Sequence, residues 1–181
     1  MSILSATGHL SPSQADAYTT ALLDLLGSQD PLTVLRDTPA AVGRELDLIP
    51  RERVAKPEAP GKWSAAIVVA HLADAELVGA FRLRMILAHE RPPLAPYDQD
   101  LWATRLHYER ATPQESLERY SVLRRANLPL WAEASAEELA RVGVHGERGE
   151  ESVERQRRLF AGHDLAHLRQ LARIRSAVTR Q

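Results

Sequence analysis

Two histidines one helical turn apart are the residues of this sequence best suited to bind a metal ion. His163 and His167 are four positions apart, so on a helix their side chains share one face with Cβ atoms about 5–6 Å apart. Neutral imidazoles at this spacing can bind one divalent ion. With seven histidines in 181 residues, chance alone gives about 0.26 such pairs per chain, so the spacing is weak evidence by itself.

The apolar residues around this pair make the interpretation stronger. In the helix expected over residues 152–179, both histidines fall on the same stripe as Leu171 and Ile174. Side chains on such a stripe face the core of the protein. Burying a polar side chain there costs a few kcal/mol unless it has a partner, so the two imidazoles require one.

A third histidine occupies a similar place in another helix. His71 lies on the apolar stripe of the helix expected over residues 64–90, and Asp74 follows one turn later. One shared ion would partner His71, His163 and His167 together, so we expect a three-histidine metal site. The alternative is that each histidine is a hydrogen-bonded core residue.

The residue composition limits the kinds of metal site. The chain has no cysteine, which excludes a disulfide framework, an iron–sulfur cluster, a cysteine zinc site and a protein thiol nucleophile. An HExxH zinc protease site fits poorly. Asp164 stands where that motif has glutamate, and the third histidine precedes the pair rather than following it.

Asp74 is the candidate catalytic residue beside the histidines. It would orient a histidine ligand or act as a base; alternatively, it pairs with a core arginine such as Arg82. Glu76 lies off the stripe and is expected to be solvated.

The candidate substrate-binding residues lie outside these two helices. Tyr97, Asp98 and Trp102 belong to a proline-rich segment over residues 91–111 that is too long for an ordinary bundle connection. They would line the mouth of a pocket or, alternatively, pack within the loop. His145 is a further candidate, although we expect an exposed loop residue there rather than a fourth ligand.

Helix-start signals indicate the elements that position these residues. Ser11-Pro12, Asp30-Pro31 and the capping box from Thr112 each precede a run with helical periodicity, and Ser64 precedes another. The expected helices cover residues 12–26, 31–49, 64–90, 112–133 and 152–179. Strand-like alternation is limited to a glycine-punctuated hairpin within 141–152. A further short helix is expected over residues 100–106.

These elements predict an all-α fold: a four-helix bundle with an extra short N-terminal helix and a long loop between the second and third main helices. We expect an N-terminal extension over residues 1–29 and a bundle domain over residues 30–181. The 23 basic and 24 acidic residues give a net charge of −1, which argues against a nucleic-acid partner. Without a signal peptide or a long apolar run, we expect a cytoplasmic protein with no membrane partner.

The sequence resembles the DinB-like superfamily and, within it, the YfiT-like family of metal-dependent hydrolases that includes bacillithiol S-transferases. The resemblance covers roughly residues 30–178, and its motifs fall in the family's order. It rests on Gly61-Lys62-Trp63-Ser64, Val69 to Asp74 including His71, Pro96-Tyr97-Asp98 with Trp102, His145-Gly146, and Gly162-His163 with His167. The family often has proline after the loop histidine, where this chain has Gly146.

The resemblance implies a homodimer and one divalent ion, zinc or nickel, on His71, His163 and His167. An open fourth position would suit catalysis. It would take either a water that attacks a small-molecule substrate or an external thiol cosubstrate such as bacillithiol, which the ion would help to ionise. The leading hypotheses are therefore a hydrolase and a thiol S-transferase. The alternative is a non-catalytic, metal-stabilised bundle that binds a ligand or serves a stress response.

Overall fold

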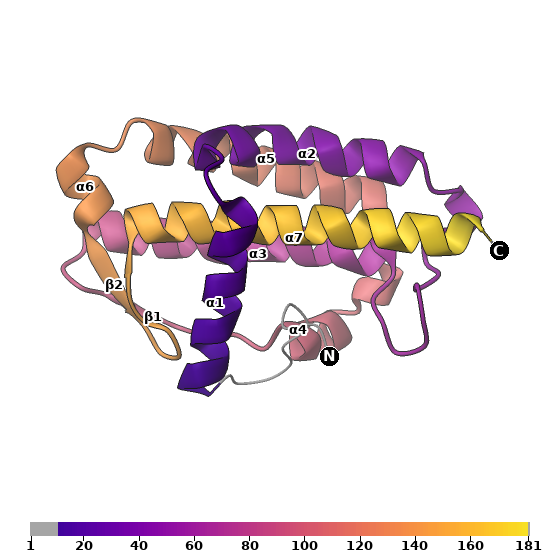
Figure 1. Ribbon diagram of the computed structural model, residues 1–181, viewed down its shortest axis with the longest axis horizontal. Coiled ribbons are helices and arrows are strands. Elements are labelled where there is room, and N and C mark those ends of the chain that lie inside the picture. Colours follow the sequence, from indigo (N-terminus) through magenta and orange to yellow (C-terminus); the bar gives the residue numbers. More distant parts are fainter. Residues whose placement is uncertain (1–10, 181) are drawn as a thin grey trace.

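Four long helices form the body of the protein in the computed structural model, which describes residues 11–180. They are α2 (Pro31–Asp47), α3 (Ala65–Ala88), α5 (Pro113–Ala132) and α7 (Val153–Thr179). Their axes are roughly aligned in Figure 1, with α3 packed on α5 and α7, and α2 packed on the same two helices. The predicted four-helix bundle is confirmed.

The predicted N-terminal helix is also present, as α1 (Pro12–Leu26). It packs across α7 at a steep angle (Figure 1). Gly162 permits this close approach, because a Cβ atom at that position would lie 2.2 Å from the carbonyl oxygen of Leu22. Residues 1–10 of the expected N-terminal extension lie outside the described residues.

Most helices begin where the capping signals predict. Ser11 accepts from the backbone N–H of Gln14, Asp30 caps α2, and Ser64 caps α3 by accepting from Ile67 N–H. The capping box expected at Thr112 is wrong, since this side chain makes no capping hydrogen bond and α5 simply begins at the following proline. A proline needs no N–H partner in the first turn, which explains why the boundary was still predicted correctly.

The connections carry the shorter elements. They are η2 (Arg51–Arg53), β1 (Pro93–Leu94), α4 (Gln99–Arg105), η3 (Tyr108–Arg110), α6 (Ala136–Ala140), β2 (Val142–His145) and β3 (Gly149–Ser152). The short helix in the long loop and the hairpin before α7 confirm the predictions. The pairing of β1 in parallel with β2 was not predicted; it produces a three-stranded sheet in the order β1-β2-β3.

Two apolar clusters fill opposite halves of the bundle core. One contains Leu46, Leu72 and Ile174, and the other contains Leu83 and Trp131. His163 and His167 lie between the α7 positions that contribute to the two clusters, whereas His71 lies among the α3 positions of the first cluster.

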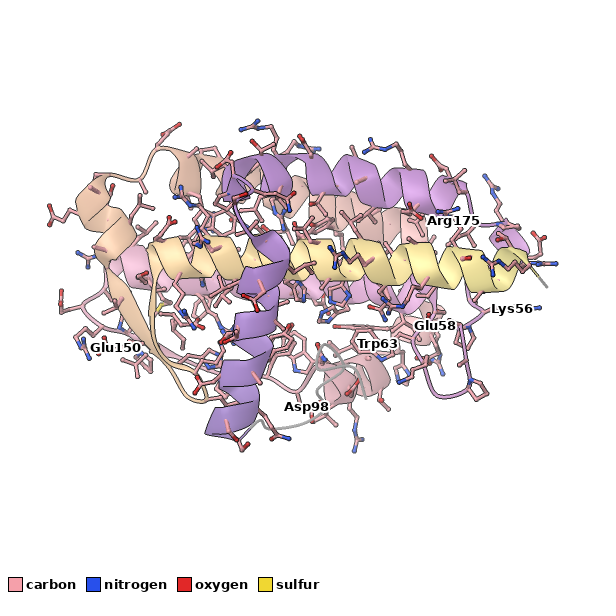
Figure 2. The ribbon with its side chains drawn as sticks, viewed as in Figure 1. Lys56, Glu58, Trp63, Asp98, Glu150 and Arg175 are labelled. Carbon is pink, nitrogen blue, oxygen red and sulfur yellow. The ribbon has the colours of Figure 1, made fainter. Side chains whose placement is uncertain are left out.

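Within residues 11–180, every helix is too short or too polar to cross a membrane. Many side chains that project from the molecule end in nitrogen or oxygen atoms, among them Lys56 and Glu150 (Figure 2).

Candidate metal centre

Three imidazoles from two helices converge in the middle of the bundle. Nε2 of His163, on α7, lies 3.1 Å from Nε2 of His71 on α3 and 3.1 Å from Nε2 of His167 one turn along α7. All three candidate ligand atoms lie within 4.8 Å of one another. The structure therefore brings together the three histidines that the sequence analysis selected.

The surroundings restrict how these rings can turn. His71 is 1% exposed, and the Trp63 ring lies 5.0 Å from it between centroids. His167 donates from Nδ1 to Oε1 of Gln170 at 2.8 Å, so its Nε2 carries a lone pair directed at the cluster. Nδ1 of His71 is buried and has no hydrogen-bond partner among residues 11–180. Gln170 was not predicted, although its place one turn after His167 is a signal that sequence reasoning could have used.

Burial keeps all three imidazoles neutral. It lowers the pKa of His71 and of His163 well below the usual value, and the neighbouring histidines lower both further. Burial also lowers the pKa of His167, although the Gln170 hydrogen bond opposes the shift. Neutral imidazole is the form that binds a metal ion.

The geometry and the chemistry of this donor set fit one divalent ion. Metal–nitrogen bonds of about 2.1 Å in a tetrahedral arrangement place neighbouring ligand nitrogens about 3.4 Å apart. The two 3.1 Å separations are close to that value. Each neutral imidazole can direct one nitrogen lone pair at a shared divalent ion.

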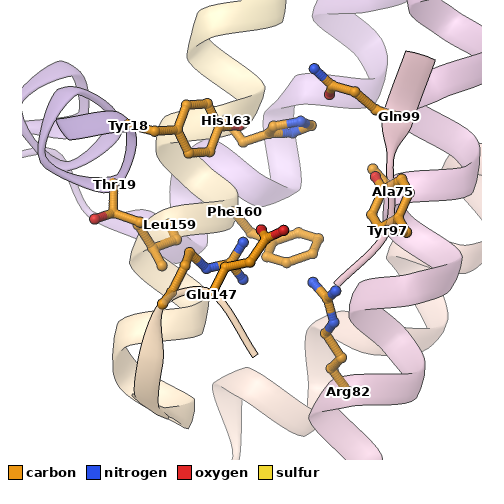
Figure 3. Close-up of a pocket in the computed structure, with 11 residues that line it drawn as sticks. Tyr18, Thr19, Ala75, Arg82, Tyr97, Gln99, Glu147, Leu159, Phe160 and His163 are labelled. Atoms are coloured by element: carbon orange, nitrogen blue, oxygen red, sulfur yellow. The ribbon is translucent and has the colours of Figure 1, made fainter. Parts of the chain in front are cut away.

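A pocket of about 120 Å³ opens onto the His163 side of the cluster. Figure 3 shows its walls, which come from α1, α3, the long loop, the β2–β3 turn and α7. Gly79 of α3 helps to shape it, because a Cβ atom there would lie 2.1 Å from the Phe160 ring. The side chains that line it include Tyr18, Arg82, Tyr97, Arg148, Phe160 and His163.

Asp74 points toward a different neighbour. Its carboxylate accepts a 2.6 Å hydrogen bond from the hydroxyl of Tyr108. Since Nδ1 of His71 has no partner and Nδ1 of His167 contacts Gln170, Asp74 orients neither of these ligands. Arg82, its alternative partner, donates instead to the carbonyl oxygen of Ala95. A role for Asp74 as a base stays a prediction.

The three candidate residues of the long loop have different roles in the structure. Tyr97 lines the pocket, as predicted. The Trp102 ring packs on the Tyr97 ring with centroids 4.6 Å apart. Both residues line an outer groove that includes Phe81. Asp98 accepts from the N–H groups of residues 100 and 101 and caps α4. Tyr97 is therefore the one of the three that contacts the pocket beside His163.

His145 is not an exposed loop residue. It lies in β2, is 2% exposed, and accepts from the N–H of Glu147 through Nδ1. Burial, with the charges of Arg148 and Arg82, lowers its pKa to about 3. The unpredicted pairing of β1 with β2 explains the difference, because that pairing covers the strand.

A second buried polar group lies close to the histidines. Glu76 is 1% exposed and forms an ion pair with Arg124 of α5, so its predicted solvation is wrong. Arg124 also pairs with Asp164, the neighbour of His163 on α7. The stripe of α3 alone could not reveal this arrangement, because α3 contacts both α5 and α7 and is buried on two sides.

A known protein structure shares this fold. YfiT from Bacillus subtilis, described as a probable metal-dependent hydrolase with an unusual four-helix bundle topology, superposes with a TM-score of 0.72 at 23% identity, covering 93% of this chain and 91% of that one. At this identity the likeness shows the fold.

Curated relatives give the same indication over shorter alignments. YfiT of Bacillus subtilis is 29% identical over 48% of this chain and 48% of its own, and a protein of Oceanobacillus iheyensis is 30% identical over 60% of this chain and 62% of its own. Both are named "putative metal-dependent hydrolase". The chain thus aligns with about half to three fifths of the length of these relatives.

The family profile covers most of the bundle, including all three histidines. The DinB superfamily matches residues 34–171. This match shows that the chain belongs to the DinB superfamily.

Proposed function

We propose that this protein is a metal-dependent hydrolase that binds one zinc or nickel ion through His71, His163 and His167. The observation that carries the proposal is the convergence of the Nε2 atoms of three neutral imidazoles, one of which, His163, lines a pocket. Three imidazoles with room for a further group suit either metal. The names of the relatives support hydrolysis as the reaction.

The protein's own residues would hold and shield the ion. His71 and His167 would hold it from the buried side, and the hydrogen bond to Gln170 keeps the His167 ring in the orientation that presents Nε2. His163 faces the pocket, where substrate would enter. A divalent ion at this place supplies Lewis acidity that activates a water nucleophile and polarises the bond to be broken.

Tyr97 is placed to bind a substrate oxygen. It lines the pocket, and burial raises the pKa of its hydroxyl above the usual value. The hydroxyl therefore stays protonated at neutral pH and can donate a hydrogen bond to a carbonyl oxygen of the substrate.

The experiment is a turnover assay with metal-loaded protein. We expect zinc- or nickel-loaded protein to hydrolyse members of a panel of small esters and amides without added thiol. His163→Ala should lose this activity. The matched control is His89→Ala, which removes an exposed histidine at the end of α3 and should retain it.

Two outcomes would contradict a hydrolase. Product formed only when a low-molecular-weight thiol and an electrophile are supplied together would identify an S-transferase. Protein that binds the ion, gains thermal stability from it and turns over nothing in the panel would identify a non-catalytic, metal-stabilised bundle.

A further inference from the structure

Arg82 places a buried cation in the pocket beside the histidines. It lies on α3 eleven residues after His71, which is three helical turns, so the two side chains share a face of the helix. Ala75 lies between them on that face and also lines the pocket. In Figure 3 the guanidinium of Arg82 extends toward the Phe160 ring and Tyr97.

Within the described residues, the buried Nε–H of Arg82 lacks a hydrogen-bond partner, and the guanidinium lies over the Tyr97 ring at 5.9 Å from its centroid. The side chain is buried, with the residue 6% exposed. One Nη donates to the carbonyl oxygen of Ala95. Within residues 11–180 it forms no salt bridge. A guanidinium has five N–H donors, and leaving buried donors unpaired is costly.

Two arginines and one glutamate line this side of the pocket. Arg148 is a second guanidinium on its wall, bound through two nitrogens to Glu151. Glu147 is the acidic side chain among the lining residues. Burial and the charge of Arg148 lower the pKa of Arg82 to about 10, so Arg82 remains a cation at neutral pH.

We propose, resting on the proposed function, that the substrate carries a carboxylate that binds Arg82 while its reacting bond lies at the His163 end of the pocket. A carboxylate accepts two parallel N–H bonds from a guanidinium and supplies the countercharge. The pocket is smaller than a drug-sized site. The substrate class is therefore a short aliphatic chain with a terminal carboxylate.

A series of two-ended probes tests this placement. Each probe has a hydroxamate at one end, which competes for the ion, and a carboxylate at the other, separated by two to six methylene groups. Its matched control has a neutral carboxamide in place of the carboxylate. Isothermal titration calorimetry on zinc-loaded protein would measure both affinities at each length.

We expect one chain length at which the acid binds about tenfold or more tightly than its amide. Arg82→Gln should abolish this preference and leave the affinity for the amide unchanged. The unchanged affinity for the amide would also show that the variant is folded. Arg125→Gln, which removes an exposed arginine on α5, should keep the preference. Equal affinity for acid and amide at every length, or a preference that survives in Arg82→Gln, would overturn the proposal.

A second arm requires no metal and so separates this proposal from the proposed function. Glutarate, titrated into metal-free protein, should shift the arginine Nε–H nuclear magnetic resonance signal that disappears in Arg82→Gln, whereas glutaramide should not. Zinc binding without any response to glutarate or any acid preference would refute the carboxylate site alone. A response to glutarate in protein that binds no zinc would refute the metal centre alone.

Discussion

The middle of this bundle contains two buried polar clusters that differ in whether they are complete. The arginine cluster consists of Glu76, Arg124, Asn127 and Asp164, each 1% exposed. The histidine cluster consists of His71, His163 and His167. Both place polar groups where a bundle would ordinarily have leucine, and they share α3 and α7 as supports.

Hydrogen bonds join each charged group of the arginine cluster to a partner. Arg124 donates to Glu76 at 2.8 and 3.0 Å, to Asp164 at 2.6 and 3.2 Å, and to the carbonyl oxygen of Leu35 at 2.8 Å. Asn127 donates to the remaining oxygen of Glu76 at 2.7 Å. Every charged group in this cluster therefore has a partner within the protein.

The histidine cluster lacks such a complement. Its members contact one another through Nε2, and Nδ1 of His71 is buried without a partner. All three pKa values are lowered, mainly by burial. The comparison shows that buried polar groups alone do not indicate a functional site. Metal-ligand atoms that converge and contact only one another are the stronger indication.

The largest expected effect is the loss of stability when the complete cluster is broken. Arg124→Met leaves two carboxylates buried without a cation and should lower the free energy of unfolding by about 3–5 kcal/mol. Urea denaturation of metal-free protein measures it. The control is Arg125→Met, an exposed neighbour on α5, for which about 0.5 kcal/mol or less is expected.

The same measurement on His163→Ala sharpens the comparison. This side chain is partly exposed at the pocket, and its hydrogen bonds run to the other imidazoles. We expect a change of about 1 kcal/mol or less in metal-free protein. If His163→Ala destabilised the metal-free protein as much as Arg124→Met, the histidine cluster would be structural in the same sense as the arginine cluster.

A change in metal affinity rather than in stability is expected when the orientation of one ligand is disturbed. Gln170→Ala removes the acceptor of His167 Nδ1–H and should weaken zinc affinity about 10- to 100-fold. Competition with a chromogenic chelator measures the affinity. Gln114→Ala, at an exposed position near the start of α5, should leave it unchanged; an equal loss in both variants would remove the assigned role of Gln170.

The last expected effect is a dependence of stability on pH that concerns His145, a buried histidine outside both clusters. Its pKa in the folded protein is about 3, against about 6.5 in the unfolded chain. Below pH 6.5 the unfolded state binds more protons, so stability falls as the pH is lowered toward 3. Between pH 6.5 and 5 this histidine should contribute a loss of up to about 2 kcal/mol.

This contribution can be isolated by comparing two proteins. We expect His145→Gln to lose less unfolding free energy than the wild type between pH 7.5 and pH 5, measured by urea denaturation in the presence of a chelator. The same pH dependence in both proteins would show that His145 is not held neutral by burial.

The sequence predicted the bundle well because helix boundaries here are encoded locally. The Asp30-Pro31 signal and the cap at Ser64 fix where α2 and α3 begin, and both helices start within a residue of the predicted position. The histidine cluster could be predicted for a related reason. Each imidazole falls on an apolar stripe of its own helix, so one helix at a time is enough to recognise it.

The remaining features depend on contacts between distant segments. Glu76 forms an ion pair with Arg124, forty-eight residues away in the sequence. No periodicity within α3 predicts that pairing. His145 is buried because β1 pairs with β2 across a long stretch of chain. Arg82 joins the pocket only when α1, α7 and the β2–β3 turn enclose it. Such pairings are set by tertiary packing rather than by local pattern.

The central claim is that the histidine cluster is a metal centre, and calorimetric titration of zinc into metal-free protein tests it most directly. The account predicts one ion bound per chain, no saturable binding in His163→Ala, and unchanged binding in His89→Ala. Failure of the wild type to bind zinc or nickel, or equal binding in the wild type and His163→Ala, would contradict it.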